Sequence, residues 1–186
     1  MTATLYCLAK DQEVQNKVRE EIKKVLGDAE ETAYLTFEEQ KQMVYLNNVI
    51  KEAIRLYPAA NFLFPRRAAR DTTINGIPVE KGTQIFISTF MIQRNPKHWK
   101  DPLKFDPSRF EKDVKPFSWI PFGIGARICL GKNFAMVEMK VLLSMILRNY
   151  QVSLPVDSPH QEEMILKGDG LALASDVQLI FNKLKM

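Results

Sequence analysis

The chain has 186 residues, 46% of them hydrophobic, which is enough to build a substantial core in roughly one domain. Lysine and arginine exceed aspartate and glutamate by four (26 against 22), but charges of both signs alternate through residues 10–31, which is typical of solvated helix faces and argues against a nucleic-acid partner. The longest apolar stretches are too short for a membrane span, and residues 1–10 lack the apolar region of a signal peptide. Two cysteines and two histidines, all far apart, argue against a disulfide framework and a zinc cluster.

The first predicted elements are helices. Apolar side chains recur at helical spacing at Val14, Val18, Ile22 and Val25 or Leu26. Asp11 is placed to cap this helix and Gly27 to end it. Residues 1–10 are also expected to be helical, but nothing in them signals a helix start. We therefore expect them to be the end of a helix that begins upstream of Met1.

A second helix is predicted between Thr36 and Pro58. Thr36 and Glu39 form a T-x-x-E capping box, and Pro58 ends the helix. One apolar face follows, made of Leu46, Val49, Ile50, Ala53 and Tyr57. Glu52 and Arg55 lie three residues apart on the same side. Taken alone, this pair is predicted to be a surface ion pair, worth less than ~1 kcal/mol.

The middle of the chain changes character. Residues 71–88 predict short strands with turns at Asn75-Gly76 and Lys81-Gly82. Residues 93–121 are rich in proline and lack periodicity, and such a long irregular stretch inside a domain usually has a function. A helix is predicted again over 131–149, with one face formed by Phe134, Val137, Val141, Leu142 and Met145. The remaining residues predict strands and loops.

The segment around Cys129 carries the strongest chemical signal. It reads FGIGARICLG, residues 122–131, and surrounds the cysteine with three glycines and an arginine. Cys129 comes just before a predicted helix, where free N–H groups and the helix dipole favour a thiolate. Arg127 offers a fork of donors to a carboxylate, and Phe122 offers an apolar wall. A thiolate beneath a flat ligand that bears carboxylates describes heme with a proximal cysteine.

Two other interpretations of Cys129 stay open on these residues alone. The cysteine could be a buried, inert thiol in a glycine-rich turn. It could also be a catalytic nucleophile, although that role needs a nearby general base and the sequence offers no obvious one.

Three motifs together resemble those of the cytochrome P-450 family, the heme-thiolate monooxygenases. FGIGARICLG fits the family pattern F-x-x-G-x-R-x-C-x-G at every position. Glu52 and Arg55 match the E-x-x-R of the family's K helix and are followed by LYP. PLKFDPSRF, residues 102–110, resembles the P-x-x-F-x-P-x-R-F stretch that precedes the heme loop. The order and spacing agree, and the resemblance covers essentially the whole chain.

The resemblance implies a mainly α fold with small β-sheets. Residues 1–186 would be the C-terminal portion of a single domain, from the end of helix I through helix L and the C-terminal strands. The N-terminal part, with any membrane anchor, and most of the central helix would be absent. So would the acid–threonine pair that delivers protons to bound oxygen in the family, because that pair would fall several residues before Met1.

The resemblance also implies roles for individual residues. Cys129 would be the axial ligand of the iron of heme b. The remaining heme contacts would come from Arg127, Arg66 (with Arg67 as the alternative), Trp119, Phe122, Gly123 and Gly131. Of these, Arg127, Arg66 and Trp119 would lie at the heme propionates. Glu52, Arg55 and Arg109 would form a buried charge network that holds the irregular stretch, so the surface interpretation of the Glu52–Arg55 pair is replaced.

Substrate and partner contacts follow less directly from the resemblance. Candidate substrate-lining residues, which could equally belong to the core, are Asn61, Phe62, Leu63, Gly170 and Leu171. Their apolar bias indicates a lipophilic substrate. Lys132 and Lys140 would lie on the face that docks an acidic NADPH-dependent reductase, or they could be ordinary surface lysines.

The expected function is insertion of one oxygen atom from O2 into a lipophilic substrate, with electrons that come from NADPH through a reductase. The alternative is a truncated heme-binding form, or a partial product, without enzyme activity. The isolated chain is expected to be inactive and poorly soluble and to bind heme weakly if at all, with the apolar surfaces of 46–57 and 134–146 exposed. The localisation of this chain is left open, and a full-length eukaryotic protein would lie at the endoplasmic reticulum membrane.

Overall fold

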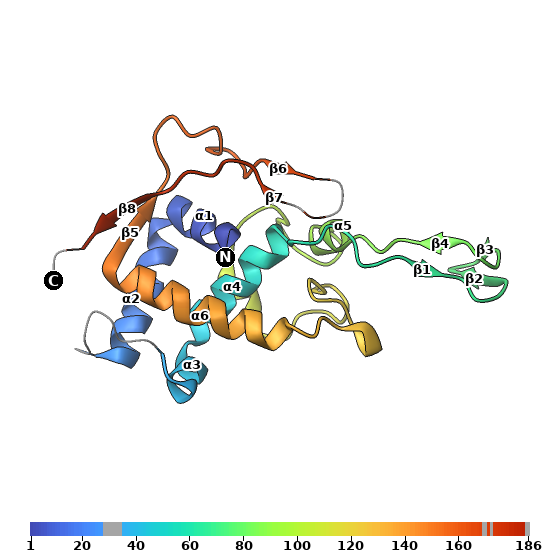
Figure 1. Cartoon of the computed structure of the whole chain (residues 1–186), viewed down its shortest axis with the longest axis horizontal. Coiled ribbons are helices and arrows are strands. Elements are labelled where there is room, and N and C mark those ends of the chain that lie inside the picture. The colour runs from blue at the N-terminus through green and yellow to red at the C-terminus, as the bar shows by residue number, and fades with distance from the viewer. Residues whose placement is uncertain (28–34, 169–170, 172, 185–186) are drawn as a thin grey trace.

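A computed structural model describes residues 1–27, 35–168, 171 and 173–184 of the chain. Its helices gather into one body, from which an arm of short strands projects (Figure 1). The α-helices are α1 (Thr2–Lys10), α2 (Gln12–Leu26), α3 (Phe37–Gln42), α4 (Val44–Leu56), α5 (Thr89–Gln93) and α6 (Lys132–Asn149). Two 3-10 helices, η1 (Pro107–Phe110) and η2 (Gly125–Arg127), lie in the segment that leads to α6.

The described strands form four two-stranded antiparallel sheets. The projecting arm contains β1 (Arg66–Arg67) paired with β4 (Gln84–Ile85), and β2 (Thr72–Ile74) paired with β3 (Ile77–Val79). On the opposite side of the body, β5 (Tyr150–Ser153) pairs with β8 (Ile180–Lys183). The fourth sheet joins β6 (Leu166–Lys167) to β7 (Leu173–Ala174). The expected mainly α fold with small sheets is therefore confirmed.

The hydrophobic core lies between α1, α2, α4 and α6. Each of these helices turns apolar side chains inward, and burying each large one contributes roughly 1.5–3 kcal/mol. The core includes Leu8, Val18, Ile22, Leu46, Val49, Ile50, Leu143 and Leu147, all with at most 1% of their surface exposed. The apolar faces predicted for residues 12–26 and 46–57 are therefore the faces of α2 and α4 that are buried.

Local sequence signals set several element ends as predicted. The Asp11 carboxylate accepts a hydrogen bond from Val14 N–H at 3.0 Å and caps α2, which ends at Gly27. Thr36 and Glu39 form the capping box of α3. Asn75 and Gly76 both have positive φ (52° and 82°) in the turn between β2 and β3, which only a few residue types tolerate.

The predicted helix between Thr36 and Pro58 is two helices instead of one. The break falls at the buried Met43, whose φ of −76° and ψ of 68° are not helical. The Glu21 carboxylate, from α2, accepts hydrogen bonds from Tyr45 N–H (2.7 Å) and Leu46 N–H (2.8 Å). These donors would otherwise be unpaired at the start of α4, so a side chain remote in sequence allows the helix to begin again there.

Of the two apolar surfaces expected to be exposed, that of 46–57 is not, whereas part of that of 134–146 is exposed as expected. The apolar face of α4 is buried by the other helices, so residues 46–57 do not form an exposed patch. In α6 the stripe that enters the core is Met139, Leu143 and Leu147, not the predicted face. Phe134 and Val137 of that predicted face are 72% and 40% exposed. Apolar side chains surround most of α6, and periodicity alone therefore did not identify its buried side.

None of the helices within the described residues is both long enough and apolar enough to cross a membrane.

Candidate functional site

Cys129 lies on the surface at the entrance to α6. Its thiol is exposed, and its backbone N–H donates to the Phe122 carbonyl at 2.8 Å. This bond closes the cysteine loop, which we define as residues 120–131. The first turn of α6 carries no acidic residue, and its N-cap, Gly131, makes no side-chain capping bond. A β-carbon added at Gly131 would lie 3.9 Å from the Cys129 sulfur, so the sulfur sits beside the start of the helix.

Gly123 lets the cysteine loop meet a second loop. Its φ of +72° is a conformation that L side chains rarely adopt. An added β-carbon there would lie 3.5 Å from the Arg127 carbonyl oxygen and 3.7 Å from the Leu63 side chain. The loop after α4 and the cysteine loop, separated by sixty residues in sequence, therefore touch at this glycine.

Large apolar side chains near Cys129 in the sequence are exposed. Ile124 and Ile128 are 45% and 46% exposed, Phe134 is 72% exposed, and Leu130 is fully exposed. Exposed apolar surface of this kind usually marks a binding site. Cys129 is thus flanked in the sequence by exposed apolar side chains and lies beside an uncapped helix start.

The structure brings Glu52, Arg55 and Arg109 together. The side chains of Glu52 and Arg55 have no exposed surface. Arg55 donates to both Glu52 carboxylate oxygens, from Nε at 2.6 Å and from Nη2 at 2.9 Å. Arg109 Nε adds a third contact to Glu52 Oε1 at 3.3 Å. We call these three residues the charge network.

The charge network holds the irregular segment through backbone groups. Arg55 also donates to the carbonyls of Gln93 (2.7 Å), Pro102 (2.7 Å) and Lys104 (3.2 Å). Glu52 accepts the N–H of Asp106 at 3.0 Å. Burial raises the pKa of Glu52, and the hydrogen bonds and charges of Arg55, Asp106 N–H and Arg109 oppose that rise. One buried helix face therefore orders the chain from 93 to 109.

A row of aromatic rings runs from the charge network to the cysteine loop. The Arg55 guanidinium lies 5.0 Å from the centre of the buried Trp99 ring. Ring contacts then follow from Trp99 to Phe110 (5.8 Å), to Trp119 (5.8 Å) and to Phe122 (6.3 Å). The indole N–H of Trp119 donates to the Lys51 carbonyl at 3.1 Å, so it is not available to the carboxylate for which it was predicted.

The predicted arginines differ in their surroundings. Arg127 is exposed in η2, and its guanidinium makes no hydrogen bond to any of the described residues. Arg66 is exposed in β1 and donates to the Phe64 carbonyl at 3.1 Å. Arg67 follows it in the same strand and is also exposed. All three guanidiniums can be approached from solvent.

The candidate substrate-lining residues gather at the base of the arm. Phe62 forms an isolated bridge with Ser88 and an edge-to-face contact with Phe86. Ala60, next to Asn61, forms a bridge with Leu171. Leu63 reaches Gly123, as described above. Gly170 lies outside the described residues.

The two lysines predicted for a docking face behave differently. Lys132 is half-buried at the start of α6. Lys140 donates to the Gln40 carbonyl at 3.2 Å, and burial lowers its pKa. Lys140 therefore links α6 to α3, which weakens the expectation that it meets a partner.

Sequence reasoning missed two buried residues of this region. Trp99, 4% exposed, lies under Arg55, and Gln93, with no exposed surface, accepts from Arg55 through its backbone carbonyl. Both fall in the stretch 93–121 that was predicted to be irregular, where neither periodicity nor a motif indicates a buried residue.

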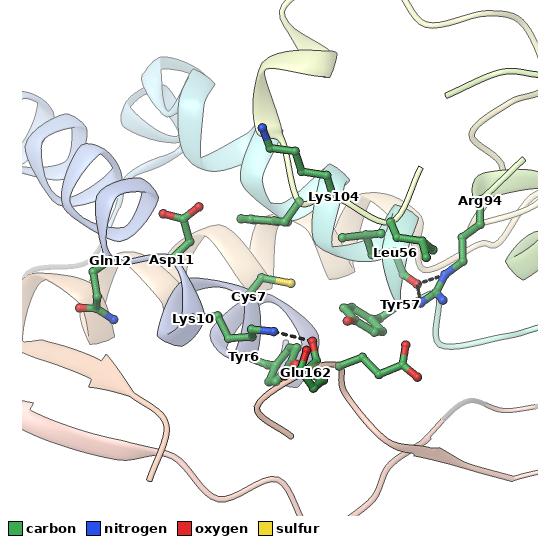
Figure 2. A pocket seen from close by; sticks show the side chains of 13 residues that line it. Tyr6, Cys7, Lys10, Asp11, Gln12, Leu56, Tyr57, Arg94, Lys104 and Glu162 are labelled. Carbon is green, nitrogen blue, oxygen red and sulfur yellow. Dashed lines mark hydrogen bonds between the residues drawn. The ribbon is translucent and has the colours of Figure 1, made fainter. Parts of the chain in front are cut away.

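A separate pocket of about 660 Å³ lies on another side of α4. Figure 2 shows it between α1, the end of α4 and the segment around Glu162, with Lys10 donating to the Glu162 carbonyl and Arg94 to the Leu56 carbonyl. Cys7 lines it, but this thiol is buried, and burial raises its pKa. None of the residues that line this pocket was predicted to contact heme or substrate.

The arrangement at Cys129 defines an exposed thiol beside the uncapped start of a helix, in a segment with exposed apolar side chains. In the comparison with known proteins, the family model for cytochrome P450 matches residues 1–178. The chain is 38% identical over 154 residues to cytochrome P450 3A41 of Mus musculus, which covers 81% of this chain and 30% of that protein. It is 41% identical over 149 residues to cytochrome P450 4e2 of Drosophila melanogaster, covering 80% of this chain and 28% of that protein.

The chain therefore belongs to the cytochrome P450 family. It spans about 30% of the length of the curated relatives that it matches.

Proposed function

We propose that this chain binds heme b through Cys129 and forms the thiolate side of a monooxygenase. The whole protein would insert one oxygen atom of O2 into a lipophilic substrate. The observation that carries the proposal is the exposed thiol of Cys129 beside the uncapped start of α6. Family membership supports the same chemistry.

The residues present fit a heme. The start of α6 has free backbone N–H groups and no acidic side chain in its first turn, so a sulfur ligand there would lie in positive potential. Ile124, Ile128 and Phe134 supply exposed apolar surface for the porphyrin ring. The exposed guanidinium of Arg127, two residues before the cysteine, is free to pair a propionate.

The heme, when bound, supplies the iron at which O2 is reduced. The contribution of this chain is to hold and orient that group. Cys129 would donate the sulfur ligand, and its N–H bond to Phe122 fixes the loop that carries it. Arg127 and Arg66 would neutralise the propionates, and the charge network would keep the cysteine loop at the end of α4.

The remaining roles concern the substrate and the electron donor. Of the candidate substrate-lining residues, Asn61 is polar, whereas the apolar character of Phe62, Leu63 and Leu171 supports a lipophilic substrate. Leu63 reaches Gly123 in the cysteine loop. Electrons would come from an NADPH-dependent reductase that docks near Lys132. We place the whole protein at the endoplasmic reticulum membrane, since the relatives come from mouse and fly.

A ligand-replacement experiment tests the proposal. The whole protein and its Cys129→Ala and Cys7→Ala variants would be loaded with heme, and the spectrum of the reduced carbon monoxide adduct would be recorded. We expect the red-shifted Soret band of thiolate ligation in the parent protein and in Cys7→Ala, and its loss in Cys129→Ala. A Cys129→Ala variant that keeps the band would refute the assignment of the ligand.

A second measurement addresses catalysis. The whole protein, with reductase, NADPH and O2, should convert lipophilic test compounds to products that carry one oxygen atom from labelled O2. Heme binding through Cys129 without any such product would favour a heme-binding form without enzyme activity.

A further inference from the structure

We propose that the side chain of Gln93 is a positioning residue for Cys129, an inference that rests on the proposed role of Cys129 as the heme ligand. Gln93 is the last residue of α5 and has no exposed surface. It lies 36 residues before the cysteine in sequence, and no motif includes it. Its amide group joins the end of α4 to the start of the cysteine loop.

The contacts of the amide use both of its ends. Nε2 donates to the carbonyls of Ile54 and Arg55, each at 3.2 Å. Oε1 accepts the backbone N–H of Ile120 at 3.0 Å. Because the nitrogen faces two carbonyls and the oxygen faces an N–H group, only one orientation of the amide satisfies all three bonds.

The bonds on the α4 side complete a helix end. The last four carbonyls of an α-helix lack partners within the helix. In α4, Ala53 accepts from Tyr57 N–H, Ile54 and Arg55 accept from Gln93, and Leu56 accepts from the side chain of Arg94. Gln93 and Arg94 together therefore cap the helix that carries the charge network.

The bond on the other side leads to the sulfur ligand. Ile120 is 4% exposed, so its N–H has little access to water if Gln93 is lost. The Ile120 carbonyl accepts Gly123 N–H at 3.0 Å, and the Phe122 carbonyl accepts Cys129 N–H at 2.8 Å. The position of Cys129 thus depends on the amide of Gln93 through one side-chain hydrogen bond and two backbone hydrogen bonds.

The chain offers a matched control in Gln15. This side chain is also fully buried, donates to the carbonyls of Leu8 and Val152, and accepts Val152 N–H at 2.9 Å. It lies against β5, at the C-terminal end of α6, whereas the cysteine loop lies at the N-terminal end (Figure 1). The eighteen residues of α6 separate the two by about 27 Å.

The test compares Gln93→Leu with Gln15→Leu in the heme-free chain, by hydrogen exchange of the peptide 118–131 and by the alkylation rate of Cys129. We expect exchange in this peptide to become about tenfold faster or more in Gln93→Leu, because a buried N–H loses its acceptor. The alkylation rate of Cys129 in Gln93→Leu should also differ from that of the parent chain by more than about twofold. Gln15→Leu should leave both within about twofold of the parent chain. Equal effects in the two variants would overturn the inference.

A second variant covers the case in which Gln93→Leu does not fold. Gln93→Met keeps the length of the side chain and buries no charge, but it removes the acceptor for Ile120 N–H, so exchange in the peptide should again become about tenfold faster. Exchange in Gln93→Met within about twofold of the parent chain would overturn the role of the Ile120 bond. These readouts need no heme, so they separate this inference from the proposed function.

The heme-loaded protein then provides a spectroscopic readout. Gln93→Leu should lower the fraction of reduced carbon monoxide adduct with the red-shifted Soret band, whereas Gln15→Leu should not. An unchanged fraction in Gln93→Leu would show that the cysteine keeps its position without the amide.

Discussion

Replacement of Arg55 by alanine is the sharpest test of the charge network. Arg55 makes five hydrogen bonds, two to Glu52 and three to carbonyls of the irregular segment. Arg55→Ala would leave the buried Glu52 carboxylate with only the Asp106 N–H at 3.0 Å and the weaker contact to Arg109 at 3.3 Å. Breaking a buried ion pair from one side costs about 3–5 kcal/mol. That is a large part of the 5–15 kcal/mol that typically stabilises a domain.

Urea unfolding followed by circular dichroism would measure this cost. Arg55→Lys should lose about 2 kcal/mol, because an ammonium cannot reproduce the two-pronged contact with Glu52. The double variant Glu52→Met/Arg55→Met should lose less than the sum of the two single replacements, since it buries no unpaired charge.

The surface pair of Lys17 and Glu13 provides the control, because both side chains are more than half exposed. Lys17→Ala should leave the urea midpoint unchanged within error. An Arg55→Ala variant as stable as Lys17→Ala would refute the reasoning, and the Glu52–Arg55 pair would then contribute no more than a surface contact.

Three further predictions concern the cysteines and glycines. Iodoacetamide should modify the exposed Cys129 in the folded chain and Cys7 only after unfolding, and equal labelling in peptide maps would contradict the structure. Burial raises the pKa of Cys7 and Tyr6, so the unfolded chain should ionise first, and the free energy of unfolding should fall as the pH rises above the ordinary cysteine pKa of about 8.5. Cys7→Ala should reduce this fall in stability. A urea midpoint of the parent chain that stays constant as the pH rises would refute the prediction. Gly123→Ala should lower the free energy of unfolding by about 1–2 kcal/mol, because Gly123 has positive φ. Gly131→Ala should lower it much less, because Gly131 has φ −81°. Equal losses in the two variants would show that the cysteine loop relaxes around the added methyl group.

Features set by neighbouring residues could be predicted from the sequence. The Asp11 cap, the Thr36–Glu39 box and the Asn75-Gly76 turn each depend on residues within three or four positions, and all three are present. The family motifs added positions that local rules could not supply. Glu52 and Arg55 alone resemble any exposed i,i+3 pair, and only the accompanying motifs indicated that the pair is buried.

Features set by distant residues could not be predicted in this way. The break at Met43 depends on Glu21, a side chain from another helix. The buried stripe of α6 could not be chosen because apolar residues occupy most of its circumference. Gln93 carries no local signal either, since its three partners are Ile54, Arg55 and Ile120 and a glutamine in an irregular segment has no pattern of its own.

The contacts of Arg55 also bear on the order in which the chain folds. One guanidinium joins α4 to carbonyls 38, 47 and 49 residues further along the chain. Closing a flexible loop of that length costs about 3 kcal/mol of chain entropy, but after the first closure the other two need only short additional loops. The segment from 93 to 109 should therefore become ordered in a single late step, after α4 has formed. Replacements in it should then accelerate unfolding more than they slow folding, which stopped-flow measurements of both rates would reveal.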